Sequence, residues 1–402
     1  MRPAADRPIL IAGGGIGGLA TALALAHKGI PSKILERRSA FAEEGAGIQI
    51  GPHGMHVLRW LGVDDAVRRN AAEPDNLKVI NARSGSVLSA LPLGSWIARR
   101  HGAPYCTAHR QDLHTALLEA ASTNPLVHIA MDGKAVDAAT VRSGVTVTLA
   151  NGATLPGAAF VGADGLWSEL RTKIFDKQQP RFAGKCAFRS VVPSEAVPQS
   201  LRGNDVHIWL AAGAHIVDYP VRRGAERALV AIFPDTQQSE AWSTDASVTD
   251  VRDRARPFAQ PLKDLLHAAS HWRKWSLYER AVPALYAKGA IALLGDAAHP
   301  VLPFLAQGAV MALEDASVVA AEIAMTPGDI PSALMRYESD RRTRVMRVQV
   351  ASRRNGQIYH LSGLMAAARN SVLRALPAER VMAGYDWLYG WKPPLPIATT
   401  IK

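Results

Sequence analysis

The chain has 402 residues, of which 48% are hydrophobic and 20% are charged. This length predicts two or three structural units, and the hydrophobic content excludes general disorder. The two cysteines, Cys106 and Cys186, are too few for a disulfide framework or a cysteine-built metal cluster. We therefore expect no metal and a reducing, cytoplasmic location. The formal net charge of +11 raises the question of a nucleic-acid or membrane partner.

Most of this charge lies near the C-terminus. Residues 336–380 hold ten arginines and three acidic residues, so this segment carries +7 and the other 357 residues carry +4. The arginines spread around a predicted helix, and no helix-turn-helix, zinc-finger or aromatic-interleaved pattern accompanies them. The pattern favours a solvated helical tail or a subunit contact over nucleic-acid binding. The uncharged residues 9–26 are too rich in glycine for a membrane span, so none is predicted.

The N-terminal region reads as a strand, a glycine-rich turn and a helix. Residues 9–12 are an apolar run, and residues 13–18 satisfy the pattern G-x-G-x-x-G. In this pattern Gly13 makes the turn, Gly15 lets the backbone approach a pyrophosphate, and Gly18 permits close packing of helix on strand. The sequence thus predicts a dinucleotide-binding fold, without choosing between NAD and FAD.

An acidic residue follows the second predicted strand at the distance that this fold requires. Glu36 lies 18 residues after Gly18, where it can accept hydrogen bonds from ribose hydroxyls. The adjacent Arg37 would suit a 2′-phosphate, but Glu36 favours an adenosine with a free 2′-hydroxyl.

Two further segments indicate which of the two cofactors, NAD or FAD, the protein binds. Residues 161–165 read V-G-A-D-G, with Arg171 beyond them, and residues 291–300 read I-A-L-L-G-D-A-A-H-P. With the glycine motif, and in the same order, they resemble the three motifs of the FAD-dependent aromatic hydroxylases, the group A flavoprotein monooxygenases with the para-hydroxybenzoate hydroxylase fold. The resemblance covers most of the chain and implies FAD as the cofactor. Besides the residues above, it implies flavin contacts from Gln49, Arg110, Asp164, Asp296, Gly308 and Ala309.

The fold class follows from these motifs and from the pattern between them. We expect an α/β protein with a Rossmann-like FAD-binding domain, an inserted, mostly antiparallel β-sheet substrate domain, and a helical C-terminal segment. The predicted boundaries are 1–76, 94–176 and 285–325 for the FAD-binding domain, 77–93 and 177–284 for the substrate domain, and 326–402 for the C-terminal segment.

The substrate residues rest on resemblance within the family. The segment around His215 and Tyr219 is similar to that of the 3-hydroxybenzoate 6-hydroxylases, whose histidine and tyrosine face the substrate. The two residues are four apart, hence on one face of a strand. A histidine that takes a phenol proton enriches the ring in electrons, as an electrophilic flavin hydroperoxide requires. Arg189 matches a family position that could hold a carboxylate, with a structural salt bridge as the alternative.

The segment at residues 303–304 gives mixed signals about the substrate. Pro303 matches the proline that salicylate hydroxylases and 6-hydroxynicotinate 3-monooxygenases, which the chain resembles here, carry at this position. Phe304, in contrast, stands where a histidine is common in both groups of enzymes. The resemblance implies a monooxygenase that uses NADH or NADPH and O2 to hydroxylate a salicylate- or 3-hydroxybenzoate-like acid through a flavin C4a-hydroperoxide.

Two alternatives stay open for the function. One changes the substrate to an N-heteroaromatic acid such as 6-hydroxynicotinate, or the reaction to an epoxidation. The other is a flavin-binding protein without hydroxylase activity, whose basic tail binds RNA or a membrane. No second G-x-G-x-x-G is present, so the nicotinamide cofactor would lack a Rossmann domain of its own. The family resemblance implies that this cofactor visits transiently, near Asp164 and Arg171. A homodimer is a further expectation.

Overall fold

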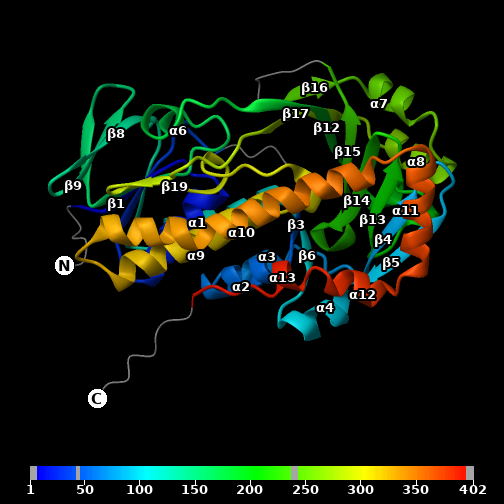
Figure 1. Cartoon of the computed structure of the whole chain (residues 1–402), viewed down its shortest axis with the longest axis horizontal. Coiled ribbons are helices and arrows are strands. Elements are labelled where there is room, and N and C mark those ends of the chain that lie inside the picture. Colours follow the sequence, from blue (N-terminus) through cyan, green and yellow to red (C-terminus); the bar gives the residue numbers. More distant parts are fainter. Residues whose placement is uncertain (1–6, 42–45, 237–242, 395–402) are drawn as a thin grey trace.

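The computed structural model describes residues 7–41, 46–236 and 243–394. Within these residues the strands form sheets of six, three, eight and two strands. The predicted α/β fold with an inserted, mostly antiparallel sheet and a helical C-terminal segment is confirmed. The six-stranded and eight-stranded sheets lie at opposite ends of the molecule, and two long helices run between them (Figure 1).

The six-stranded sheet carries the N-terminal glycine motif. Its strands, in spatial order, are β18 (Ala287–Lys288), β19 (Ile291–Leu293), β11 (Ala159–Gly162), β1 (Ile9–Ala12), β2 (Ser32–Leu35) and β7 (Val127–Ala130). All neighbours are parallel except β18 and β19. Every residue of β1 is buried, as expected for a parallel strand covered on both faces. Helix α1 (Ile16–His27) packs on this sheet and against α5 (Arg110–Ser122) and α9 (Gly308–Met325).

The eight-stranded sheet is built mainly from the middle of the chain. Its strands, in spatial order, are β16 (Thr244–Ala246), β17 (Trp272–Glu279), β12 (Arg181–Pro193), β15 (Glu226–Pro234), β14 (Ala214–Val221), β13 (Val206–Ala211), β4 (Asn76–Asn81) and β5 (Val87–Pro92). Only β13 and β4 pair in parallel. One face packs on α7 (Val248–Ala255) and α8 (Gln260–His267) through a core that includes Phe188 and Trp209. The other face, with Val217 and Val230, packs toward residues of the C-terminal helices.

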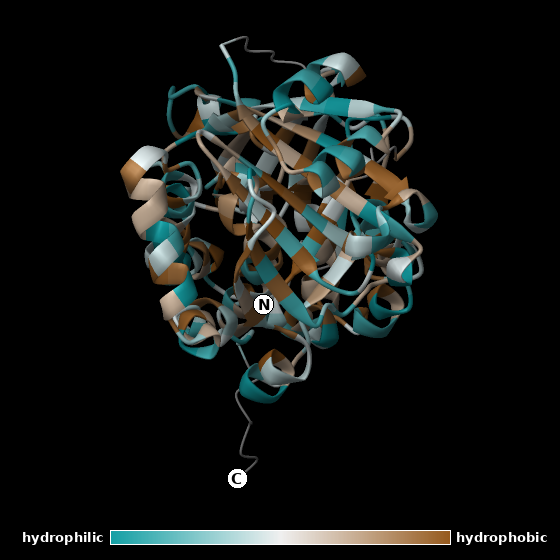
Figure 2. Cartoon of the chain, turned by 90° about the vertical axis from the view of Figure 1, so that its right-hand side faces the viewer, coloured by the Kyte–Doolittle hydropathy of each residue, from teal (hydrophilic) through white to brown (hydrophobic). Residues whose placement is uncertain are grey.

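Smaller sheets and helices complete the structure. Strands β3 (Gly47–Ile50) and β6 (Cys106–His109) form a ribbon, and β8 (Ala135–Val141), β9 (Gly144–Leu149) and β10 (Thr154–Gly157) form the three-stranded sheet. The shorter helices here are α2 (Pro52–Trp60), α3 (Asp64–Arg68), α4 (Gly94–His101) and α6 (Glu169–Ile174). Seen from the side of β5, hydrophobic and hydrophilic residues mix along strands and helices (Figure 2).

The C-terminal segment corrects one expectation. Helix α10 (Ile330–Tyr359) lies along α9, and α11 (Gly363–Ala375), α12 (Ala378–Ala383) and α13 (Asp386–Tyr389) follow it (Figure 1). Arg347, Arg353 and Arg354 of α10 are exposed, but α10 is not a solvated tail, because other arginines of the helix are buried or paired against α9. Arg341 is only 1% exposed and pairs with Glu314 and Asp315 of α9. The prediction was wrong because the acidic partners lie on another helix, outside the arginine-rich segment.

Within the described residues, no helix combines the length and the hydropathy needed to cross a membrane. Both cysteines are free and buried.

Candidate active site

The glycine motif folds into the turn that its spacing predicts. Gly13 has φ +97°, and a Cβ at this position would lie 2.6 Å from the carbonyl oxygen of Ala163. A Cβ on Gly18 would lie 1.9 Å from the oxygen of Gly13. Only glycine fits these two positions. Gly15 is the N-cap of α1, and among the described residues, apart from Gly15 and its two chain neighbours, no atom lies within 4 Å of where its Cβ would be, which leaves room for a ligand at the helix N-terminus.

Glu36 reaches back to this turn from the end of β2. Its carboxylate accepts hydrogen bonds from the backbone N–H of Gly14 at 2.8 Å and of Arg38 at 3.0 Å. Glu36 is buried, whereas Arg37 is exposed. The predicted ribose-binding carboxylate therefore lies directly beside the predicted phosphate-binding turn.

Asp164 lies at the same turn and has an unused acceptor. Its Oδ1 is sealed from solvent and has no hydrogen-bond partner among the described residues. Burial raises the pKa of Asp164 to about 6. A buried acceptor of this kind is costly unless a hydrogen-bond donor meets it, and the hydroxyl groups of a dinucleotide are such donors. This feature fits FAD.

Asp296 brings the second flavin motif to the start of helix α9. It lies in a short 3-10 turn, Gly295–Ala297, and its Oδ1 would be 3.8 Å from a Cβ on Gly308, the first residue of α9. Burial raises the pKa of Asp296, while the positive charge of Arg110 at the start of α5 opposes this shift. Asp296, Arg110, Gly308 and the adjacent Ala309 thus come together beside a helix N-terminus, which favours negative charge.

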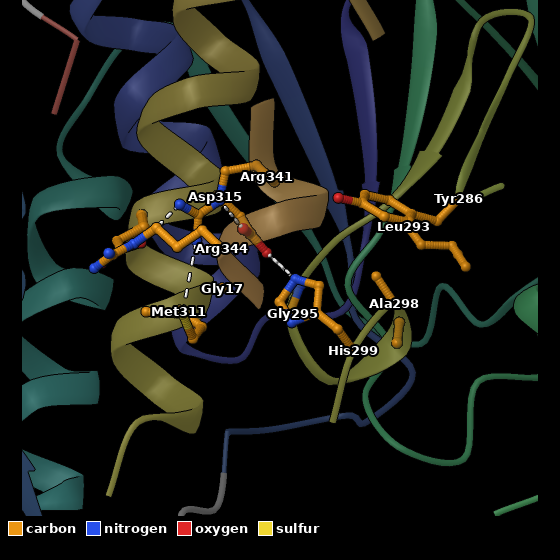
Figure 3. Close-up of polar contacts among 12 residues, drawn as sticks. Gly17, Tyr286, Leu293, Gly295, Ala298, His299, Met311, Asp315, Arg341 and Arg344 are labelled. Carbon is orange, nitrogen blue, oxygen red and sulfur yellow. Dashed lines mark hydrogen bonds and ion pairs between the residues drawn. The ribbon is translucent and has the colours of Figure 1, made fainter. Parts of the chain in front are cut away.

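A buried ionic cluster holds this turn in place (Figure 3). Asp315 of α9 accepts hydrogen bonds from the backbone N–H of Gly295 at 3.0 Å and from His299 Nε2 at 2.6 Å. Its other oxygen lies 2.6 Å from Arg341 Nε of α10. The positive charges of His299 and Arg341 hold the pKa of Asp315 well below its usual range. Helix α10 therefore supports the Asp296 turn through Asp315.

His215 lies in an aromatic cluster at one end of strand β14. The side chain is 1% exposed, and its Nδ1 lies 2.7 Å from Nε2 of His360. Its ring centroid lies 5.6 Å from that of Phe304 and 5.2 Å from that of Tyr359. Pro303 and Phe304 belong to a 3-10 turn, Pro303–Leu305, just before α9. The structure thus brings Phe304 of the flavin-motif segment onto the predicted histidine.

Tyr219 lies four residues along the same face of β14, beside Arg189 of β12. The register of β12, β15 and β14 places Arg189, Val217 and Tyr219 on one face of the sheet. Burial raises the pKa of Tyr219, and the charges of Arg189 and a hydrogen bond to Gln49 oppose this shift. Tyr105 also donates to Gln49, at 2.6 Å. Tyr219 is therefore close to both Arg189 and Gln49.

Arg189 is a half-buried cation with unused hydrogen-bonding capacity. Its Nε is sealed from solvent without a partner among the described residues, and its guanidinium lies 5.0 Å from the ring centroid of Trp275. Burial lowers the pKa of Arg189. The alternative of a structural salt bridge is not what the structure contains, because no described carboxylate pairs with Arg189.

Sequence reasoning did not identify several residues of this region. His299 and Asp315 lie inside or just after the second flavin motif, so their proximity to Asp296 could have been suspected. His360 and Tyr359 carry no local signal, because they are about 145 residues from His215 and meet it only through the packing of α10. Within the described residues, no group of three or more His, Cys, Asp or Glu side chains could hold a metal ion.

The comparisons with known proteins agree with this geometry. The family model described as "FAD binding domain" matches residues 6–352. The 3-hydroxybenzoate 6-hydroxylase of Polaromonas naphthalenivorans (strain CJ2) is 35% identical over 388 residues, covering 96% of each chain. The 6-hydroxynicotinate 3-monooxygenase of Pseudomonas fluorescens is 31% identical, covering 86% of this chain and 90% of its own.

A solved structure shares the fold. Klebsiella pneumoniae HpxO in complex with FAD and uric acid has a TM-score of 0.84 and 25% identity, covering 94% of this chain and 95% of its own. FAD is thus the cofactor of this protein. The chain belongs to the FAD binding domain family and, within it, to the FAD-dependent aromatic hydroxylases.

Proposed function

We propose that the protein is an NAD(P)H- and O2-dependent monooxygenase that hydroxylates a phenolic aromatic acid of the salicylate or 3-hydroxybenzoate type. The observation that carries this proposal is the row of Arg189, Tyr219 and His215 on one sheet face, next to the start of α9. A half-buried cation without an ion-pair partner suits a carboxylate, and a buried neutral imidazole suits a phenol. The relatives named 3-hydroxybenzoate 6-hydroxylase support the same substrate class.

Each residue of this row has a distinct task in the proposal. Arg189 binds the substrate carboxylate, and Tyr219 donates a hydrogen bond to the substrate. His215 takes the phenol proton, since burial keeps its pKa well below the usual value and the ring neutral. Pro303 and Phe304 close the site on the flavin side. FAD, when bound, supplies hydride acceptance and O2 activation.

The nicotinamide cofactor would enter beside the D-G motif. A cavity of about 390 Å³ there is lined by residues that include Trp167, Lys173 and Arg280. The Nε of Arg280 is buried without a partner, and Arg171 and Arg280 share the single carboxylate of Asp176. The resulting excess of positive charge suits a pyrophosphate.

An N-heteroaromatic acid is the second candidate substrate. The relative named 6-hydroxynicotinate 3-monooxygenase favours it, as does the pair of neutral imidazoles at the site, because a ring nitrogen can hydrogen-bond to either of them. Arg189 would then hold the carboxylate in the same way.

A substrate panel tests the proposal. Purified FAD-containing protein is mixed with NADH or NADPH and with each of a series of hydroxybenzoates and hydroxynicotinates, and product is quantified by mass. We expect hydroxylated product from at least one phenolic acid, with stoichiometric NAD(P)H oxidation. A protein that gives product only with hydroxynicotinates favours the second candidate, and one that forms no product from any member contradicts both.

The variant His215→Ala tests the site assignment. It should hold FAD as well as wild type, because the side-chain contacts of His215 among the described residues are with Phe304, Tyr359 and His360 and not with the turns of Gly13, Asp164 or Asp296. The variant should slow hydroxylation by about 10²-fold or more, the usual contribution of a general base. His267→Ala, at an exposed histidine of α8, is the matched control. Unchanged coupled turnover in His215→Ala would remove this residue from the site.

A further inference from the structure

Two histidines from distant parts of the chain lie within hydrogen-bonding distance of each other through their ring nitrogens. His215 Nδ1 and His360 Nε2 are 2.7 Å apart. Two imidazole nitrogens at this distance need one N–H and one lone pair between them, so the pair shares a proton. His215 is buried, whereas His360 is half-buried. The contact therefore joins a sealed side chain to one that reaches solvent.

The position of His360 is fixed from three sides. Its carbonyl accepts a hydrogen bond at 3.0 Å from the backbone N–H of Gly213, in the turn between β13 and β14. Arg369 of α11 donates to the carbonyls of Ile358 and Tyr359 at 2.8 and 2.9 Å. The ring centroid of His360 lies 5.6 Å from that of Phe304, edge to face. The end of α10 is thus held against the strand that carries His215.

The other nitrogens of the pair are free for proton transfer. Within the described residues, Nε2 of His215 and Nδ1 of His360 have no hydrogen-bond partner. One end of the pair is therefore available to a ligand and the other to water. A proton can cross the pair without either side chain moving.

We propose that His360 is a positioning residue that also relays the phenol proton of the substrate from His215 to solvent. This inference rests on the proposed function. The substrate O–H bond breaks as an N–H bond forms at His215 Nε2. The Nδ1 proton of His215 passes to Nε2 of His360, and the Nδ1 proton of His360 passes to water. The products are a bound phenolate, two neutral imidazoles and one hydronium ion, and no electron changes hands.

The charges around the pair agree with a relay and disfavour a resting imidazolium. Lys185 of β12 acts on both rings and Arg369 of α11 on His360, while the other facing groups, Phe304 and Tyr359, are uncharged. Burial, followed by these charges, lowers the pKa of His360 to about 4. Because the proton ends in water, the low basicity of the two imidazoles does not determine how far the substrate phenol ionises. The positive charges of Lys185 and Arg189 favour the phenolate.

Two substitutions separate the relay from simple packing. His360→Gln keeps an acceptor for the Nδ1–H of His215 but cannot pass a proton on, and His360→Phe removes both abilities. The oxidised FAD-containing protein is mixed in a stopped-flow instrument with a phenolic acid that the wild type hydroxylates. Phenolate absorbance and proton release to an indicator dye are followed from pH 5 to 9. His267→Gln, at an exposed histidine, is the control.

The relay has a definite signature. Both variants should retain FAD and bind the phenolic acid, while phenolate formation and proton release slow by about tenfold or more, within the range of acid–base contributions. Added imidazole should restore part of the rate. His360→Gln that releases protons as fast as wild type overturns the relay, as does a slowing confined to His360→Phe. A wild type that hydroxylates no phenolic acid instead overturns the proposed function.

Discussion

Arg189 is a residue whose surroundings make sense only with a ligand present. Its side chain is half-buried, its Nε is sealed from solvent without a hydrogen-bond partner, and no described carboxylate neutralises its charge. An unpaired buried charge costs stability, and such residues persist where function uses them. In the proposed function the cost is offset when the substrate carboxylate binds.

This reasoning predicts opposite effects on stability and on substrate binding. Arg189→Met should leave the free energy of unfolding unchanged or higher, because an apolar side chain of similar length replaces a half-buried charge that has no described ion-pair partner. It should raise the KM for the aromatic acid about tenfold to a hundredfold, the value of a charge-assisted hydrogen bond, and leave the KM of an uncharged phenol unchanged. Urea unfolding and steady-state kinetics measure the two effects.

The same strand offers a control for this substitution. Arg181, also on β12, is 81% exposed and pairs with Glu279 at the surface. Arg181→Met should change neither quantity by much, since exposed ion pairs contribute little. An Arg189→Met protein that is clearly destabilised, with an unchanged KM for the acid, would show that Arg189 is structural.

Helix α10 stabilises the turn of the second flavin motif, which contains Asp296. Its Arg341 lies between Glu314, at 2.7 Å, and Asp315, at 2.6 Å, and all three side chains are buried. Asp315 in turn holds the backbone of Gly295 and the ring of His299. Removing the cation leaves two buried carboxylates with less compensation, which is far more costly than losing a surface pair.

We therefore predict a large difference between two arginines of one helix. Arg341→Met should lower the free energy of unfolding by about 3–5 kcal/mol and weaken FAD binding, because the Asp296 turn loses its support. Arg353→Met should cost at most about 1 kcal/mol, because Arg353 is 44% exposed where it pairs with Glu279. Urea unfolding and flavin titration of both variants provide the measurement. Equal losses in the two would contradict the bracing role of α10.

The sequence predicts local conformation well and tertiary proximity poorly. The turn at Gly13 and the position of Glu36 follow from spacing, because both depend on one strand–turn–helix unit. The partnership of His215 with His360 does not, since it depends on how a 30-residue helix packs across the molecule. The prediction that the arginines of α10 form a solvated tail is wrong for the same reason. Arg341 and Arg344 pair with Glu314 of α9, and the amino-acid composition does not show that the two helices pack together.

Across the whole molecule, these ion pairs neutralise part of the positive charge of the arginine-rich segment. Arg336, Arg341, Arg344 and Arg353 pair with Glu322, Glu314, Asp315 and Glu279, all of which precede the arginine-rich segment in the chain. Much of the +7 of that segment is thus neutralised locally by acids from other elements. The net charge of +11 is therefore not the charge of one exposed basic helix, and it acts as a broad positive field.

A broad positive field makes a prediction about encounter with substrate. The kcat/KM for an anionic aromatic acid should fall as NaCl rises from 10 to 300 mM, because the Debye length shrinks from about 30 Å to less than 10 Å. The uncharged methyl ester or a neutral phenol that is also turned over should show little change, since no charge attracts it. Steady-state kinetics with both compounds in one buffer test this. If salt slowed both equally, it would be acting on the enzyme itself, and attraction of the anion would play no part.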